Sequence, residues 1–185
     1  DLFHPDLYPL DILDNVMSSG RSSRLVKELK EERGLVYGVS TGSWTPHFGA
    51  GSFQVSARLQ DEHLEETIEA IVQAFDRTRE EGITEEELAR AKKQKIAHFV
   101  LNQQDAEEIA STIGSDLMGT GDATFSRRYV RRIQAVRCED VQRVLRTYFD
   151  RSNLTCAAVR PKGDEAASTA GATASAARSP IRKHD

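Results

Sequence analysis

Apolar side chains recur every three or four residues along several stretches of the chain, which is the pattern of helices that bury one face. These stretches predict helices over residues 6–17, 22–32, 62–81, 84–117, 125–135 and 139–149. Gly34 and Gly82 stand where the second and third of these helices should end. Thr84 and Glu87 form a capping-box pair that predicts the start of a long helical region, and its polar middle at 102–108 predicts a kink. The residues expected in the core share the helical spacing: Leu7, Leu10, Ile12, Leu13, Val16, Met17, Leu88, Ala91, Ile96, Val100, Ile109 and Ile113.

Alternating apolar and polar residues predict three strands, over residues 35–40, 53–59 and 153–159. The first two flank a turn at 44–51 that is rich in Gly and Pro, so we expect an antiparallel hairpin. Cys156 falls in the third strand and is expected in the core. The order of elements predicts an α+β fold, a mainly antiparallel sheet with helices packed on one face. Three strands are few for a stable sheet, so we expect the sheet to be incomplete.

The composition changes after Pro161 to Ala, Ser, Thr and Gly without apolar periodicity. Such a segment cannot bury enough surface to offset its ordering entropy. We therefore expect one domain over residues 1–160 and a disordered tail over 161–185.

Charge and composition exclude several classes of function. A net charge of -4 argues against a nucleic-acid binder, and the cluster Arg127, Arg128, Arg131 and Arg132 is expected to be a solvated helix face. The 2 cysteines can form neither a disulfide framework nor a metal cluster. No stretch is long and apolar enough to span a membrane, so we expect no membrane partner. No signal-peptide pattern is present, which favours the cytoplasm, although a chain that begins with Asp1 can lack a natural targeting segment.

A series of short motifs follows in a fixed order along the chain. The segment from His4 to Val39 reads HPDLYPLDILDNVMSSGRSSRLVKELKEERGLVYGV. It is followed by Thr-Glu-Glu-Glu-Leu at 84–88, Glu-Asp-Val at 139–141 and Asn-Leu-Thr at 153–155. Over residues 2–160 this series resembles the C-terminal-type, non-zinc domain of insulinase, pitrilysin and mitochondrial processing peptidase-like (inverzincin) zinc metallopeptidases. That domain begins with a strand before the position of Asp6, so the resemblance implies that the first strand is missing here.

The resemblance implies a zinc-dependent endopeptidase for peptides or presequence-like segments. In that family an HxxEH helix of a partner, N-terminal-type domain holds the zinc, which activates water for amide hydrolysis. This sequence has no HxxEH, and the nearest string, from His63 to Thr67, has Thr in place of the second His. Threonine cannot replace an imidazole ligand. We therefore expect that this chain binds no metal, is inactive alone, and pairs with a zinc-bearing domain in the same chain or in a partner subunit.

The resemblance also implies site residues. Active family members place an Arg and a Tyr, seven residues apart, at the substrate; Tyr37 matches, whereas Lys30 stands at the Arg position. Lysine offers a point charge in place of a planar guanidinium fork, so Lys30 departs from the family pattern. Tyr37 can equally be a strand residue with β propensity and no catalytic role. The family's loop near the substrate path corresponds to Ser18, Ser19, Gly20, Ser22 and Ser23, which a helix end and a serine N-cap explain as well.

Three functions remain open from the sequence. The chain can be the substrate-binding, chamber-forming half of a zinc endopeptidase. It can also be a non-catalytic partner or scaffold subunit of the same family, which Lys30 in place of Arg favours slightly. A generic α+β interaction module ranks last, because it requires the ordered motif series to be coincidence.

Overall fold

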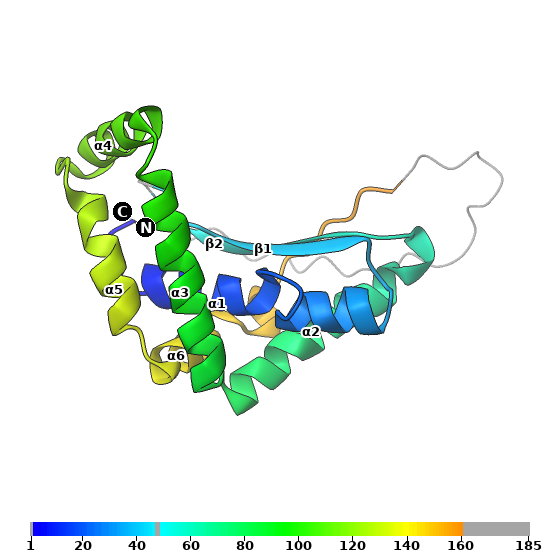
Figure 1. Cartoon of the computed structure of the whole chain (residues 1–185). Coiled ribbons are helices and arrows are strands. Elements are labelled where there is room, and N and C mark those ends of the chain that lie inside the picture. The colour runs from blue at the N-terminus through cyan, green and yellow to red at the C-terminus, as the bar shows by residue number, and fades with distance from the viewer. Residues whose placement is uncertain (1, 47–48, 161–185) are drawn as a thin grey trace, which may run out of the picture. The chain divides into compact units, whose positions relative to one another are not determined.

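The chain folds into helices and one β-hairpin over residues 2–46 and 49–160, which the computed structural model describes (Figure 1). The α-helices are α1 (Leu7–Ser18), α2 (Leu64–Glu81), α3 (Glu85–Asn102), α4 (Ala106–Thr120), α5 (Tyr129–Ala135) and α6 (Cys138–Tyr148). The strands are β1 (Gly38–Trp44) and β2 (Ser52–Arg58), and a π-helix, η1 (Val26–Glu32), precedes them. Single turns of 3-10 helix lie at Asp61–His63 (η2), Phe125–Arg128 (η3) and Arg151–Asn153 (η4). The predicted α+β class is confirmed.

Helix α1 forms the centre of the core. Its residues Ile12, Leu13, Val16 and Met17 are at most 1% exposed, because α1 packs against β1, α3, α5 and α6 at once. The predicted apolar stripe of this helix is therefore confirmed. Asp6, directly before α1, accepts hydrogen bonds from Arg143 (2.5 Å) and from the Tyr148 hydroxyl (2.7 Å), so that the start of α1 is tied to α6.

The hairpin packs on the helices with one face. Strands β1 and β2 are antiparallel, with Val39 opposite Ala57 and Thr41 opposite Val55. Val39, Phe53 and Val55 pack against the core, whereas Ser40, Gln54 and Ser56 point to the other face and are exposed. The alternation of the sequence thus sets which face meets the helices, as expected for a half-buried sheet.

Helix ends follow the signals in the sequence. Gly82 ends α2 with a φ of 79°, a backbone conformation that side chains disfavour. Thr84 and Glu87 form both bonds of the capping box that starts α3. The predicted kink is a full break, because α3 ends at Asn102 and the Asp105 side chain accepts from the Glu107 N–H to start α4.

Several expectations were wrong in detail. Strand β1 begins at Gly38, not at Leu35, because Leu35 and Val36 are buried ahead of the strand and contribute to the core. The expected last strand over 153–159 is absent among the described residues, where the sheet has 2 strands, and Cys156 is exposed. An alternating sequence forms a strand only where a neighbouring edge accepts its hydrogen bonds. Val100 and Ile113, expected in the core, are 50% and 43% exposed.

The chain divides into two units, Asp1–Thr155 and Cys156–Asp185. The helices and strands named above all belong to the first unit. Of the second unit the structure describes residues 156–160, which are exposed. The tail predicted over 161–185 lies outside the described residues.

Candidate functional site

Tyr37 and Lys30 lie on the two sides of the junction between η1 and β1. The Tyr37 N–H donates to the Arg58 carbonyl oxygen (2.7 Å), and the Leu35 N–H donates to the Leu29 carbonyl oxygen (2.8 Å), so the backbone of the junction is fixed. Tyr37 is 60% exposed, and within the described part of the chain its hydroxyl makes no hydrogen bond. Lys30 is also exposed. The structure thus brings both side chains to the surface of one junction but forms no bond between them.

The junction contains an unusual turn. Residues Val26–Glu32 wind as a π-helix, which the Arg33 N–H closes by donating to the Glu28 carbonyl oxygen (3.0 Å). The wider turn still buries Leu29 completely. Turns of this kind are rare in proteins as a whole, but those that occur are often found at functional sites. They have no chemistry of their own.

The serine-rich loop divides into bound and free hydroxyls. The Ser18 hydroxyl lies 2.7 Å from the Thr41 hydroxyl and accepts from the Thr41 N–H (2.8 Å), which joins the end of α1 to β1. Ser23 is fully buried and donates to the Gly20 carbonyl oxygen (2.6 Å). Ser22 and Gly20 are exposed and Ser19 is half-buried. Ser18 and Ser23 therefore hold the loop in place, while Ser19 and Ser22 are the hydroxyls available to a ligand.

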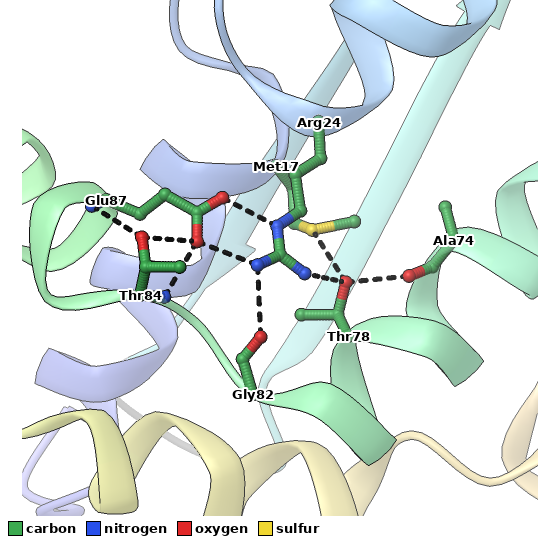
Figure 2. Close-up of polar contacts among 7 residues, drawn as sticks. All are labelled: Met17, Arg24, Ala74, Thr78, Gly82, Thr84 and Glu87. Atoms are coloured by element: carbon green, nitrogen blue, oxygen red, sulfur yellow. Dashed lines mark hydrogen bonds and ion pairs between the residues drawn. The ribbon is translucent and has the colours of Figure 1, made fainter.

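Arg24 anchors this loop to the helices behind it (Figure 2). Its guanidinium donates to both carboxylate oxygens of Glu87 (2.7 Å each), to the Thr78 hydroxyl (3.0 Å) and to the Gly82 carbonyl oxygen (3.0 Å). Glu87 is also the capping residue at the start of α3. This ion pair links the Ser-Arg-Leu segment at 23–25 to the Thr-Glu-Glu-Glu-Leu motif at 84–88, and its two residues lie 63 positions apart.

The pKa of Glu87 reflects this arrangement. Burial opposes its ionisation, but the hydrogen bonds from Arg24 and from Thr84 outweigh burial and lower the pKa to about 2. Glu87 therefore remains a carboxylate at every physiological pH. Because the two motifs form a structural link, their presence in this chain is explained by folding and says nothing about catalysis.

The described residues offer no fit for the zinc that the resemblance implies. No group of three or more His, Cys, Asp or Glu among them is placed to hold a metal ion. His63 lies at the start of α2, where its near neighbour is Glu62 (3.7 Å).

A polar cluster that the sequence did not predict lies along α1 and shares Thr41 with the serine-rich loop. The Tyr129 hydroxyl donates to Asp11 (2.7 Å), and Lys95 pairs with Asp14 (2.8 Å), which also accepts from the Thr41 hydroxyl (2.7 Å). Burial raises the pKa of Asp11, and burial together with Asp11 raises the pKa of Tyr129. These residues come from α1, β1, α3 and α5, so no local pattern could have shown that they meet. The two acidic residues in a largely apolar helix, Asp11 and Asp14, were the only hint in the sequence.

Comparison with known proteins identifies the chain. The family model described as "Peptidase M16 inactive domain" matches residues 2–95. The chain belongs to the peptidase M16 family. The M16 inactive-domain chain is 29% identical over 145 residues to an uncharacterized zinc protease of Streptomyces coelicolor, covering 78% of this chain and 31% of that protein. It is 26% identical over 161 residues to a protein of Helicobacter pylori that is named a non-peptidase homolog, covering 85% and 36%.

The fold of this M16 chain agrees with the family assignment. A peptidase M16 inactive domain from Pseudomonas fluorescens superimposes with a TM-score of 0.69 at 23% identity, covering 78% of this chain and 34% of that one. The chain thus spans about a third of the length of the relatives it matches. The relatives named zinc proteases place zinc in the family. No helix of the described residues combines the length and the apolar character needed to cross a bilayer.

Proposed function

We propose that this M16 chain is the substrate-binding, chamber-forming and non-catalytic domain of a zinc-dependent endopeptidase. In this proposal a zinc-bearing, N-terminal-type domain of the same family, in the same chain or in a partner subunit, faces it and carries the metal. The observation that carries the proposal is Tyr37, an exposed phenol with a free hydroxyl on a fixed backbone, at the position that the family resemblance assigns to substrate.

Tyr37 would act on the transition state. A hydroxyl aimed at the scissile carbonyl can donate to the oxyanion as it forms, which is worth about 3 kcal/mol per donor. Lys30 would attract a carbonyl or carboxylate oxygen of the peptide as a point charge. Ser19, Gly20 and Ser22 would contact the peptide beside this position, while Ser18 and Ser23 hold their loop. The substrates would be peptides or presequence-like segments.

The test uses the intact parent protein, or the complex with the zinc-bearing domain. Hydrolysis of an internally quenched fluorescent peptide should be present, should stop with a chelator, and should fall in Tyr37→Phe while peptide binding is retained. A zinc-loaded assembly in which the Tyr37→Phe variant cleaves the peptide at the wild-type rate would refute the catalytic role.

A second candidate is a non-catalytic partner or scaffold subunit of the same family. Two observations favour it: the similarity to the non-peptidase homolog of Helicobacter pylori, and Lys30 at the position where active members have Arg. The rest of the parent protein decides between the candidates. An HxxEH helix with a distal Glu there supports the enzyme, and zinc-free parent protein without peptidase activity supports the partner.

We extend the proposal to the whole chain in three respects. Residues 1–160 form the M16 domain and 161–185 a tail outside it. The net charge of -4 makes a nucleic-acid partner unsuitable. The partners are then peptides and the zinc-bearing, N-terminal-type domain, called the sister domain below. The cytoplasm is the compartment that the sequence favours.

A further inference from the structure

A hollow of about 300 Å³ lies between the start of α1, the end of β1 and the segment before α5. Its walls are partly aromatic, formed by Tyr8, Phe125 and Tyr129, and partly polar, formed by Asp11, Asp116 and the hydroxyl residues Ser43, Thr45 and Ser126. The Tyr8 and Tyr129 rings are 6.1 Å apart, tilted by 51°. The hollow is separate from the junction that carries Tyr37.

Asp11 is the carboxylate with free capacity in this hollow. One oxygen, Oδ2, accepts from the Tyr129 hydroxyl (2.7 Å), whereas Oδ1 has no hydrogen-bond partner among the described residues. In Asp116, by contrast, neither oxygen is without a partner, because the Ser126 N–H (2.8 Å) donates to one and the Ser126 hydroxyl (2.7 Å) to the other. A ligand with N–H donors would therefore find its unpartnered acceptor in Asp11.

The lining residues of the hollow include neither Lys nor Arg. Lys95, outside the lining, pairs with Asp14 (2.8 Å), and its charge also favours the ionised form of Asp11. Arg128 lies over the Phe125 ring (5.7 Å) and pairs with Asp122 outside the lining. The lining itself thus carries two carboxylates and no cation, and the two nearby cations, Lys95 and Arg128, each pair with a carboxylate outside the lining.

We propose that this hollow binds an organic cation, the alkylammonium group of a lysine side chain or of a free amine, with Asp11 as its counter-ion. The ammonium donates to the free Oδ1 of Asp11, and its hydrogens meet the Ser43 or Thr45 hydroxyls. The alkyl stem lies against Tyr8 and Tyr129, and the ring quadrupole attracts the ammonium where it approaches a ring face. Tyr129 is a positioning residue, because its hydroxyl holds the Asp11 carboxylate toward the hollow. This inference is independent of the proposed peptidase role.

The test is titration of the purified chain with n-butylammonium chloride, followed by NMR of the aromatic side chains. We expect saturable shifts of the Tyr8, Phe125 and Tyr129 signals, and no saturation with 1-butanol, which has the same number of heavy atoms and no charge. Asp11→Asn should weaken binding by about tenfold or more, the order expected when a hydrogen bond to a charged group is lost. Asn still accepts from the Tyr129 hydroxyl, so the fold should be kept.

One control variant and one further test variant complete the experiment. Glu108→Gln removes one exposed carboxylate of α4, outside the hollow, and should leave the butylammonium affinity unchanged. Tyr8→Leu keeps apolar volume but removes one ring, and should weaken binding severalfold. Equal shifts with 1-butanol, or unchanged affinity in Asp11→Asn with an unchanged melting temperature, would overturn the proposal.

The source of the cation follows from a matched pair of peptides, acetyl-Ala-Ala-Lys-Ala-Ala-amide and the same sequence with norleucine. If the lysine peptide saturates the same aromatic signals and the norleucine peptide does not, the natural ligand is a basic side chain. If neither peptide binds while butylammonium does, the hollow serves a free amine.

Discussion

Tyr37 carries the catalytic proposal at the scale of single residues, and its exposure makes a clean test possible. In the assembled enzyme, Tyr37→Phe should lower kcat by about a hundredfold, because only a donor to the transition state is lost. The melting temperature should not change, since Tyr37 is 60% exposed and its hydroxyl has no partner among the described residues. Turnover of the intact parent with a fluorescent peptide measures this.

The control for Tyr37 is another aromatic residue of the same hairpin. Trp44, at the far end of β1, is 58% exposed, and Trp44→Phe should leave kcat within a few fold. Lys30→Arg is the companion variant, and a gain in activity would show that this position still faces substrate. If kcat is unchanged in both Tyr37→Phe and Lys30→Arg, the domain is a scaffold without a catalytic role.

Glu87 gives a second prediction at this scale, on stability. Its side chain is 17% exposed, and removing one partner of a half-buried pair leaves the other without compensation. Glu87→Gln should therefore lower the free energy of unfolding by about 2 to 3 kcal/mol at pH 7. Glu66→Gln is the control, because Glu66 is 54% exposed in its pair with Arg33 and should cost less than about 0.5 kcal/mol.

The effect of Glu87 should depend on pH with a defined sign. Its folded pKa of about 2 lies below its ordinary value of 4.5, so the unfolded chain binds the proton more tightly. The stability from this group is fully present above about pH 5 and is lost as the pH falls toward 2. Urea unfolding at pH 7 and pH 3 should show a smaller difference between wild type and Glu87→Gln at pH 3. An equal difference at both values would attribute the loss to packing instead.

Contacts between residues far apart in the sequence could not be predicted at this scale. The Thr84–Glu87 capping box was predicted because its two partners are three residues apart. The bond between Tyr129 and Asp11 joins residues 118 apart, and Arg24 reaches Glu87 across 63. No spacing rule covers such pairs, because the packing of segments far apart in the sequence creates them.

Elements were predicted well where their signals are local. The apolar stripe of α1 and the end of α2 at Gly82 depend on neighbours along the chain, and both are confirmed. The strand expected over 153–159 needed a partner edge, and the alternation of apolar residues could not show whether one was present. The exposure of Val100 and Ile113 has a similar reason, since a helical stripe shows amphipathicity but not what covers it.

Two glycines in helical regions should respond to alanine with opposite signs. Gly82 has φ 79° and ψ -170°, a region in which side chains are strained, although its Cβ would meet only the Gln142 side chain at 3.8 Å. Gly82→Ala should therefore destabilise by about 1 to 3 kcal/mol through backbone strain. Gly114 lies inside α4 with nothing within 4 Å of a Cβ, so Gly114→Ala should stabilise by about 0.5 to 1 kcal/mol.

Denaturant unfolding of the two glycine variants beside the wild type measures both effects. A Gly82→Ala variant as stable as the wild type would mean that the turn between α2 and α3 relaxes to a negative φ. A destabilised Gly114→Ala would mean that α4 is not helical around this residue in solution.

At the scale of the whole molecule, the proposed division of labour requires that the chain alone has no metal site. None of its 5 histidines has a second histidine four residues away, and the described residues contain no group of ligands placed for a metal. A catalytic zinc needs three protein ligands in fixed geometry. We therefore predict that the purified chain, loaded with zinc chloride and passed through gel filtration, retains no stoichiometric zinc in metal analysis. It should also cleave no fluorescent peptide, whether zinc is present or not.

The positive control for this prediction is the intact parent protein, loaded with zinc and analysed in the same way. Under the enzyme proposal, the parent should retain one zinc and lose activity with a chelator, while the chain alone shows neither property. A ligand that binds only the folded state raises the melting temperature. Because we expect the chain to bind no zinc, zinc should leave its melting temperature unchanged. A chain that holds one zinc per molecule and melts higher with the metal would overturn the assignment of catalysis to the sister domain, since the metal centre would then lie in residues that the spacing of histidines did not reveal.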